Sequence, residues 1–175
     1  KIYAVLITRG CPHSCTYCGN NALWKASCGK YLRYRSVDNV ISELRIAKKR
    51  FPFIKMVAIQ DDVFFIRPID YIKDFAKKYK KYINYPLAGN ISPLTVNDEK
   101  IKVMVDLGMN NITMGVQSGS DRINLKIFKR MTPREKVLDA MKILHKYVKK
   151  RKLNVGYQFI IDVPYETNQD IRDTA

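Results

Sequence analysis

The chain has 175 residues, 46% of them hydrophobic, and a formal net charge of +16. This length and composition suit one globular domain with a substantial core. No apolar run reaches the about 18 residues of a membrane span, and no secretory signal is visible. The sequence opens on Lys1 and closes on a helix-like segment, residues 169–175. We therefore expect a fragment of a longer protein, with an upstream domain and a C-terminal part missing.

The excess positive charge invites a nucleic-acid-binding interpretation. Most of it, however, falls at the C-terminal ends of expected helices, where cations complement the helix dipole; these clusters are residues 45–50, 77–81 and 146–152. In an α/β barrel those ends face away from the ligand site. We favour solvation or docking of an absent acidic domain, and nucleic acid stays possible without being favoured.

Apolar runs and helical periodicity alternate along the chain. The expected strands are residues 2–8, 54–60, 85–91, 111–116 and 153–161. The expected helices are residues 37–47 after an N-cap at Ser36, 68–79 with Pro68 in the first turn, 97–107 before a C-terminal Gly108, 121–128, 132–149, and one opened by Thr167.

Five βα units in succession indicate a parallel sheet in the α/β class, as either an open doubly wound sheet or a barrel, complete or partial. Both place ligands at the carboxyl ends of the strands. Polar residues follow each strand in this sequence, in the segments 11–18, 60–62, 90–92, 117–120 and 162–166. The pattern therefore predicts one site at that end of the sheet.

The first of these segments carries Cys11, Cys15 and Cys18 in C-x3-C-x2-C spacing. Three thiolates leave one coordination position open, whereas structural zinc sites and fully protein-ligated clusters use four ligands. Cys28 or His13 could supply a fourth ligand, and Cys28 is better explained as a free thiol. Spacing alone leaves a reactive cluster and a structural metal evenly matched, and the position after the first strand favours the reactive cluster.

The segment Thr8-Arg-Gly-Cys11-Pro-His-Ser-Cys15-Thr-Tyr17-Cys18 resembles the signature of the radical S-adenosylmethionine (SAM) superfamily. The resemblance implies a partial TIM-type (βα)6 barrel, truncated here after about five units, with residues 1–175 forming the core domain. It also implies that the three cysteines hold a 4Fe–4S cluster, which reductively cleaves SAM to a 5′-deoxyadenosyl radical that acts on an unknown substrate.

The same resemblance assigns SAM contacts at the strand ends. These are Tyr17 and Ile161 near the adenine, Asp61 and Asp62 at the amino group, Gln117 and Ser118 near the ribose and methionine, Arg130 at the carboxylate, and Asn90 at the end of the third strand. In the strand-five motif, Asp162 and Tyr165 replace two usual glycines, so a turn with positive φ would be strained there.

The paired Asp61-Asp62 resembles the subgroup that carries an upstream cobalamin-binding domain, which implies methyl transfer or rearrangement. Two alternatives stay open: a tRNA methylthiotransferase, whose Gly-Val-Gln-Ser-Gly motif is similar to residues 115–119, and a non-catalytic module with a structural metal. The expected partners are a small-molecule or macromolecular substrate and a reductant such as flavodoxin or ferredoxin. Clustered cysteines also favour a reducing cytoplasm.

Overall fold

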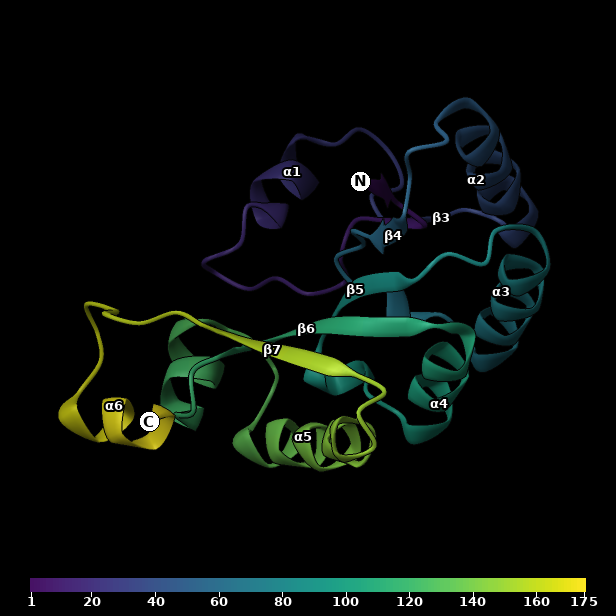
Figure 1. The fold of residues 1–175 in the computed structure, drawn as a ribbon. Helices are drawn as coiled ribbons and strands as arrows, with labels where there is room; N and C mark the ends of the chain where they lie inside the picture. The colour runs from purple at the N-terminus through teal and green to yellow at the C-terminus, as the bar shows by residue number, and fades with distance from the viewer.

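The computed structural model describes residues 1–175 and contains one parallel five-stranded sheet in the order β1-β4-β5-β6-β7 (Figure 1). The strands are β1 (Ile2–Val5), β4 (Met56–Ile59), β5 (Leu87–Ile91), β6 (Met109–Gln117) and β7 (Asn154–Phe159). Each strand pairs with the next one in parallel register, for example Val5 with Ile59 and Ile59 with Gly89. The predicted α/β class and parallel sheet are confirmed.

Four helices cover one side of this sheet (Figure 1). They are α2 (Val37–Arg50), α3 (Ile69–Tyr82), α4 (Asp98–Leu107) and α5 (Arg134–Lys149). The Ser36 hydroxyl caps α2 by accepting from the amide of Asn39, and Gly108 ends α4 with a left-handed φ of 118°. The predicted caps are therefore confirmed. Pro68 differs slightly, because it is the N-cap of α3 and not its first helical residue.

The first predicted strand is shorter than its apolar run. After β1 the chain turns away, and β2 (Thr8–Arg9) pairs antiparallel with β3 (Arg33–Tyr34). Between β2 and β3 lies the helix α1 (Asn20–Ala26), which the sequence did not predict and which buries none of its residues. Residues 9–33 thus form an excursion outside the main sheet.

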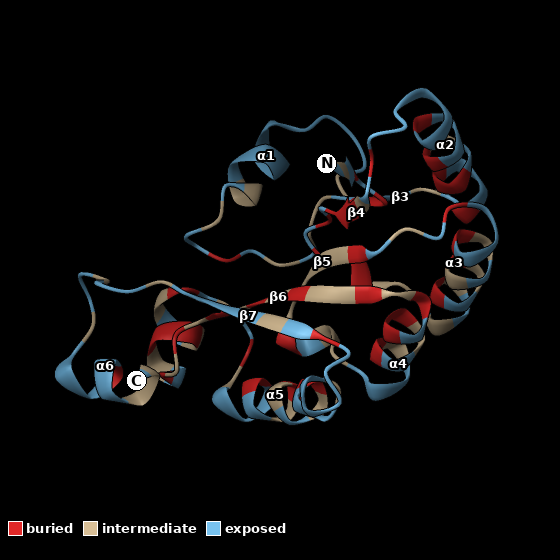
Figure 2. Cartoon of the chain, viewed as in Figure 1, coloured by how far each residue is buried: buried red, intermediate tan, exposed pale blue.

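The last elements lie at the far edge of the sheet. Strand β7 is mostly exposed, in contrast to the buried centre of β4 (Figure 2). Helix α6 (Asn168–Thr174) follows, and Thr167 forms a capping box with Asp170. The predicted helix at 121–128 is a π-helical segment, Arg122–Ile127. Ser120 and Arg122 bind the carboxylate of Asp170, which ties this segment to α6.

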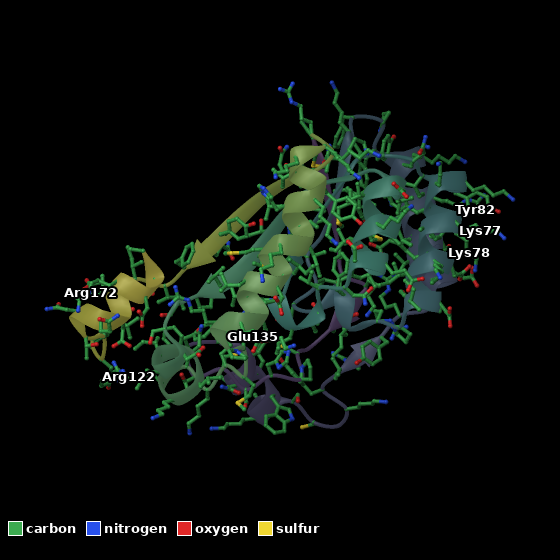
Figure 3. All side chains as sticks on the ribbon, turned by 90° about the horizontal axis from the view of Figure 1, so that it is seen from below. Lys77, Lys78, Tyr82, Arg122, Glu135 and Arg172 are labelled. Carbon is green, nitrogen blue, oxygen red and sulfur yellow. The ribbon has the colours of Figure 1, made fainter.

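The basic residues gather at helix ends as predicted, with Lys48, Lys49 and Arg50 in the last turn of α2. Figure 3 shows Lys77 and Lys78 projecting from α3 on one flank, while Arg122 and Arg172 lie at the opposite end of the molecule. None of the helices combines the length and apolar character that a bilayer crossing requires.

Candidate SAM and iron–sulfur site

A cavity of about 450 Å³ lies where the carboxyl ends of β4, β5 and β6 meet the cysteine loop. Its volume falls within the range of about 300–1,000 Å³ that is typical of small-molecule sites. Its lining residues come from every part of the predicted site: Cys11, His13, Cys15, Tyr17, Cys18, Asn20, Gln60, Asp61, Asp62, Val63, Asn90, Ile91, Ser92, Thr113, Gly115, Gln117, Arg130 and Gln158. The structure therefore brings the three cysteines and most of the predicted SAM contacts together.

The cysteine loop is held by its own backbone and by α1. Gly10 has a φ of 85°, and a β-carbon there would lie 2.7 Å from the carbonyl oxygen of Tyr31, so only glycine fits. The hydroxyl of Tyr31 donates to Asn20 at 2.7 Å. The Asn21 amide donates to the carbonyl oxygen of Cys15 at 2.8 Å. The unpredicted helix α1 thus holds the loop through Asn20 and Asn21.

The three thiols lie on this loop in an environment suited to a cluster. Burial raises the pKa of the Cys11 thiol, and a hydrogen bond from the backbone of His13 opposes the rise. Three cysteines on one loop fit a polynuclear cluster, because cluster cysteines bind separate irons and three of them leave one iron open. Cys28 is exposed and does not line the cavity, as expected for a free thiol.

The two aspartates after β4 have different surroundings. Asp61 is 0% exposed, and its carboxylate oxygens accept from the backbone amides of Ile7 at 2.6 Å and Thr8 at 2.7 Å. It therefore joins β4 to the start of the cysteine loop, and the expectation that both aspartates meet the SAM amino group needs correction. Asp62 is exposed at the cavity and is the carboxylate free to receive an ammonium group.

Arg130 is positioned by two hydrogen bonds at the cavity wall. Its Nη1 donates to the hydroxyl of Tyr17 at 2.8 Å, and its Nη2 donates to the carbonyl oxygen of Gly115 at 2.7 Å. Its Nε is buried without a partner in the protein. An orphaned guanidinium N–H in a cavity fits a carboxylate ligand, since a planar guanidinium pairs with carboxylates through several N–H groups.

Asn90 and Gln117 also line the cavity, at the ends of β5 and β6. The pairing of β6 with β7 shifts register between Gly115 and Gln117, and Gln117 has a φ of 72°. Positive φ in a residue other than glycine is costly, and such strain is common where a bulge redirects a side chain at a functional site.

Two predicted contacts lie elsewhere. Ser118 is buried, and its hydroxyl is 3.1 Å from that of Thr174 in α6, because the bulge turns the chain away from the cavity after Gln117. Ile161 is 77% exposed and lines a separate cavity beside α6. Neither residue lines the main cavity, and both SAM contacts stay predictions. Asp162 adopts a φ of 61°, so the strained turn expected at that substitution is confirmed.

Sequence reasoning missed several residues of the cavity wall, among them Asn20, Thr113 and Gln158. Thr113 and Gln158 lie within β6 and β7, before the strands end, where no polar motif marks them. The only sequence signal for these two residues was the alternation of side chains between the two faces of a strand. His13 was considered as a metal ligand but not as part of the cavity wall, where the structure places it.

Comparison with known proteins identifies the family of this chain. Residues 5–175 match the Radical SAM superfamily. The chain is 32% identical over 173 residues to an uncharacterised methyltransferase of Pyrococcus horikoshii, covering 97% of this chain and 35% of that protein. It is 26% identical over 166 residues to the cytidylyl-2-hydroxyethylphosphonate methyltransferase of Streptomyces wedmorensis, covering 94% of this chain and 29% of that protein. The chain thus spans about a third of the length of these curated relatives.

Solved structures show the same fold at low sequence identity. The cobalamin-dependent SAM radical enzyme OxsB matches with a TM-score of 0.75 and 21% identity, over 98% of this chain and 25% of that chain. The radical SAM methyltransferase TsrM of Kitasatospora setae matches with a TM-score of 0.78 and 12% identity, over 99% of this chain and 31% of that chain. The cysteine loop, the strand-end cavity and the match across residues 5–175 together establish that this chain belongs to the radical SAM superfamily.

Proposed function

We propose that residues 1–175 form the SAM-cleaving core of a cobalamin-dependent methyltransferase, incomplete at its C-terminal end and preceded in the whole protein by a cobalamin-binding domain. The observation that carries the proposal is the single cavity shared by the three cysteines and the polar groups of three strand ends. The methyltransferase assignment is supported by the names of both curated relatives. The cobalamin assignment is supported by the similarity to OxsB and TsrM.

Cys11, Cys15 and Cys18 hold the 4Fe–4S cluster in this proposal, since three thiolates leave one iron for SAM. When bound there, the cluster would supply the single electron needed to break a carbon–sulfur bond of SAM. The cysteine loop keeps the thiolates at fixed positions through Gly10 and Asn21.

The remaining cavity residues bind and orient SAM. Asp62 receives the ammonium group, and Arg130 pairs with the carboxylate through the N–H that has no protein partner. Tyr17 positions Arg130 and packs edge-to-face with Phe128, with ring centroids 4.9 Å apart. Asn90 and Gln117 offer amide groups for the ribose hydroxyls. Asp61 acts indirectly, because it fixes the backbone from which the cysteine loop starts.

The substrate is a small molecule or a macromolecular group, and the electron comes from a carrier such as flavodoxin or ferredoxin in a reducing cytoplasm. The tRNA methylthiotransferase alternative remains a prediction, and the accumulation of basic residues at helix ends far from the cavity gives it no support.

The proposal is tested on the full-length protein, reconstituted anaerobically with iron and sulfide. Dithionite should convert SAM to 5′-deoxyadenosine and methionine, and cobalamin should bind or co-purify. If 5′-deoxyadenosine forms but cobalamin does not bind, the assignment as a radical SAM core stands and the assignment as cobalamin-dependent is wrong. An intact, reducible cluster that leaves SAM unchanged under several reductants would overturn the catalytic role and favour structural or electron-transfer use of the cluster.

A further inference from the structure

His13 lies inside the cysteine loop with an unused buried nitrogen. Its Nε2 atom is buried and has no hydrogen-bond partner in the protein. Such orphaned polar atoms are rare in folded proteins and usually mark the place of a ligand or an ordered water. The residue lines the main cavity together with all three cysteines. It also lines a second cavity of about 260 Å³, which lies between the cysteine loop and α1. His13 therefore lies between the two cavities.

The surroundings of His13 restrict what its nitrogen can bind. The backbone of the same residue donates to the sulfur of Cys11, so the loop bends around that thiol at His13. The neighbouring guanidinium of Arg130 offers only N–H donors. The sulfur atoms of an iron–sulfur cluster, in contrast, are acceptors only. A histidine ring carries at least one N–H in either protonation state, and with that proton on Nε2 the nitrogen is able to donate to them.

We propose that the Nε2–H of His13 donates a hydrogen bond to a sulfur of the cluster, either an inorganic sulfide or the thiolate of a cysteine in the loop. This inference rests on the proposed function, because it needs the cluster. Hydrogen bonds to cluster sulfurs stabilise the more negative, reduced state and raise the reduction potential. His13 is thus a positioning residue that makes the cluster easier to reduce, and it is not itself an iron ligand.

The test is a redox titration of the full-length reconstituted protein without SAM, followed by electron paramagnetic resonance. His13→Phe keeps a ring of similar size and removes the donor, whereas His13→Gln places an amide N–H near the position of Nε2. His145 is the matched control, because it is the second of the two histidines in the chain and lies exposed on α5. Iron and sulfide content should be normal in all three variants.

We expect His13→Phe to lower the reduced-to-oxidised ratio at a fixed potential about tenfold, which corresponds to about 59 mV for one electron. His13→Gln should recover most of that shift, and His145→Phe should show none. A normal cluster with an unshifted potential in His13→Phe overturns the inference alone. A shift that His13→Gln does not recover also overturns it, because packing or solvent access then explains the change.

Two further outcomes are decisive. If SAM affinity falls in His13→Phe while the reduction potential stays constant, Nε2 binds SAM, and the proposed hydrogen bond from His13 to a cluster sulfur is wrong. If the wild-type protein assembles no four-iron cluster, the proposed function fails, and this inference fails with it.

Discussion

The hydroxyl of Tyr17 accepts a hydrogen bond from Nη1 of Arg130 at 2.8 Å, across 113 positions of sequence. Burial raises the pKa of Tyr17 to about 12, although the positive charge of Arg130 opposes the rise. The phenol is therefore neutral at physiological pH and accepts through an oxygen lone pair. This contact connects the cysteine loop to the segment after the π-helical turn, so the cluster and the proposed SAM carboxylate site are positioned together.

Removing Arg130 should weaken SAM binding more than removing the hydroxyl of Tyr17. Arg130→Gln should weaken it about ten- to a hundredfold, since hydrogen bonds to charged groups contribute about 1.5–3 kcal/mol. Tyr17→Phe should weaken it about fivefold, as for a hydrogen bond of about 1 kcal/mol. The double variant should bind no more weakly than Arg130→Gln, because Tyr17 acts through the arginine. Calorimetric titration of the reconstituted protein measures all three, and additive losses would contradict the coupling.

Replacing any one of Cys11, Cys15 and Cys18 by Ala should abolish the four-iron cluster. The reason is that each thiolate holds a different iron, so no remaining side chain in the loop substitutes for it. Cys28→Ala is the matched control and should retain full iron and sulfide content, because Cys28 is exposed away from the cavity. Iron and sulfide analysis checks both. A wild-type protein that binds zinc and ignores iron and sulfide is the contrary result.

The two aspartates should separate into a ligand-binding residue and a folding residue. Asp62→Asn should weaken SAM binding about ten- to a hundredfold and leave the free energy of unfolding within about 0.5 kcal/mol of wild type. Asp61→Asn should lower that free energy by about 1–3 kcal/mol, because its amide NH2 would face a backbone N–H of Ile7 or Thr8. Equal effects of both substitutions on SAM affinity would refute the separation.

Asp61 should also give the fold a distinctive pH dependence. Burial raises its pKa to about 6, and the hydrogen bonds from Ile7 and Thr8 reduce the shift. Between about pH 4 and 6 the folded carboxyl therefore holds a proton that an unfolded aspartate has released. The contribution of Asp61 to the free energy of unfolding accordingly falls as pH rises through this window, by up to about 3 kcal/mol, and is constant above it.

Urea unfolding of the cluster-free protein at several pH values isolates this contribution. The difference in unfolding free energy between wild type and Asp61→Asn should shrink as pH rises from about 4 to 6. Other titrating groups, such as Asp170, cancel in that difference. A difference that is independent of pH would show that Asp61 keeps an ordinary pKa.

Gly119 should be essential for packing α6 against the loop after β6. A β-carbon there would meet the backbone carbonyl of Asp173 and lie 2.7 Å from Cα of Thr174. Gly119→Ala should lower the free energy of unfolding by about 1–3 kcal/mol, as other overpacked sites do. Gly156→Ala is the control, since nothing lies within 4 Å of a β-carbon at that position in β7. Equal unfolding midpoints in urea would contradict the packing argument.

The regular part of the fold was predictable from the sequence because periodicity and caps agree. Val40 and Leu44 recur at helical spacing after a serine cap, and the structure confirms the helix. Helix α1 was not predictable, because its residues are all exposed or half-buried and leave no apolar pattern. The cysteines, Tyr17, Asp62, Asn90, Gln117 and Arg130 were found from motifs and share the cavity.

The misplaced site residues have a common cause, since each depends on long-range geometry. The carboxylate of Asp61 accepts hydrogen bonds from backbone amides just after the neighbouring strand β1. The sequence does not indicate which of two adjacent aspartates points into the protein. Ser118 is redirected by the bulge at the end of β6, which one sequence does not reveal. His13 can be read from the sequence, but only the structure shows that its buried Nε2 has no hydrogen-bond partner.

The excursion that carries the cysteines starts and returns at nearly one point of the sheet. The backbone amide of Arg35 donates to the carbonyl oxygen of Ile7 at 3.1 Å, and its guanidinium donates to that of Leu6 at 2.9 Å. The pairing of Thr8 with Tyr34 joins the two ends of the excursion at the same place. Residues 9–33 therefore leave and rejoin the main sheet at neighbouring points. A short turn in place of residues 9–33 should leave a cluster-free scaffold, and exchange with the equivalent stretch of a relative should produce chimaeras that retain the five-stranded sheet.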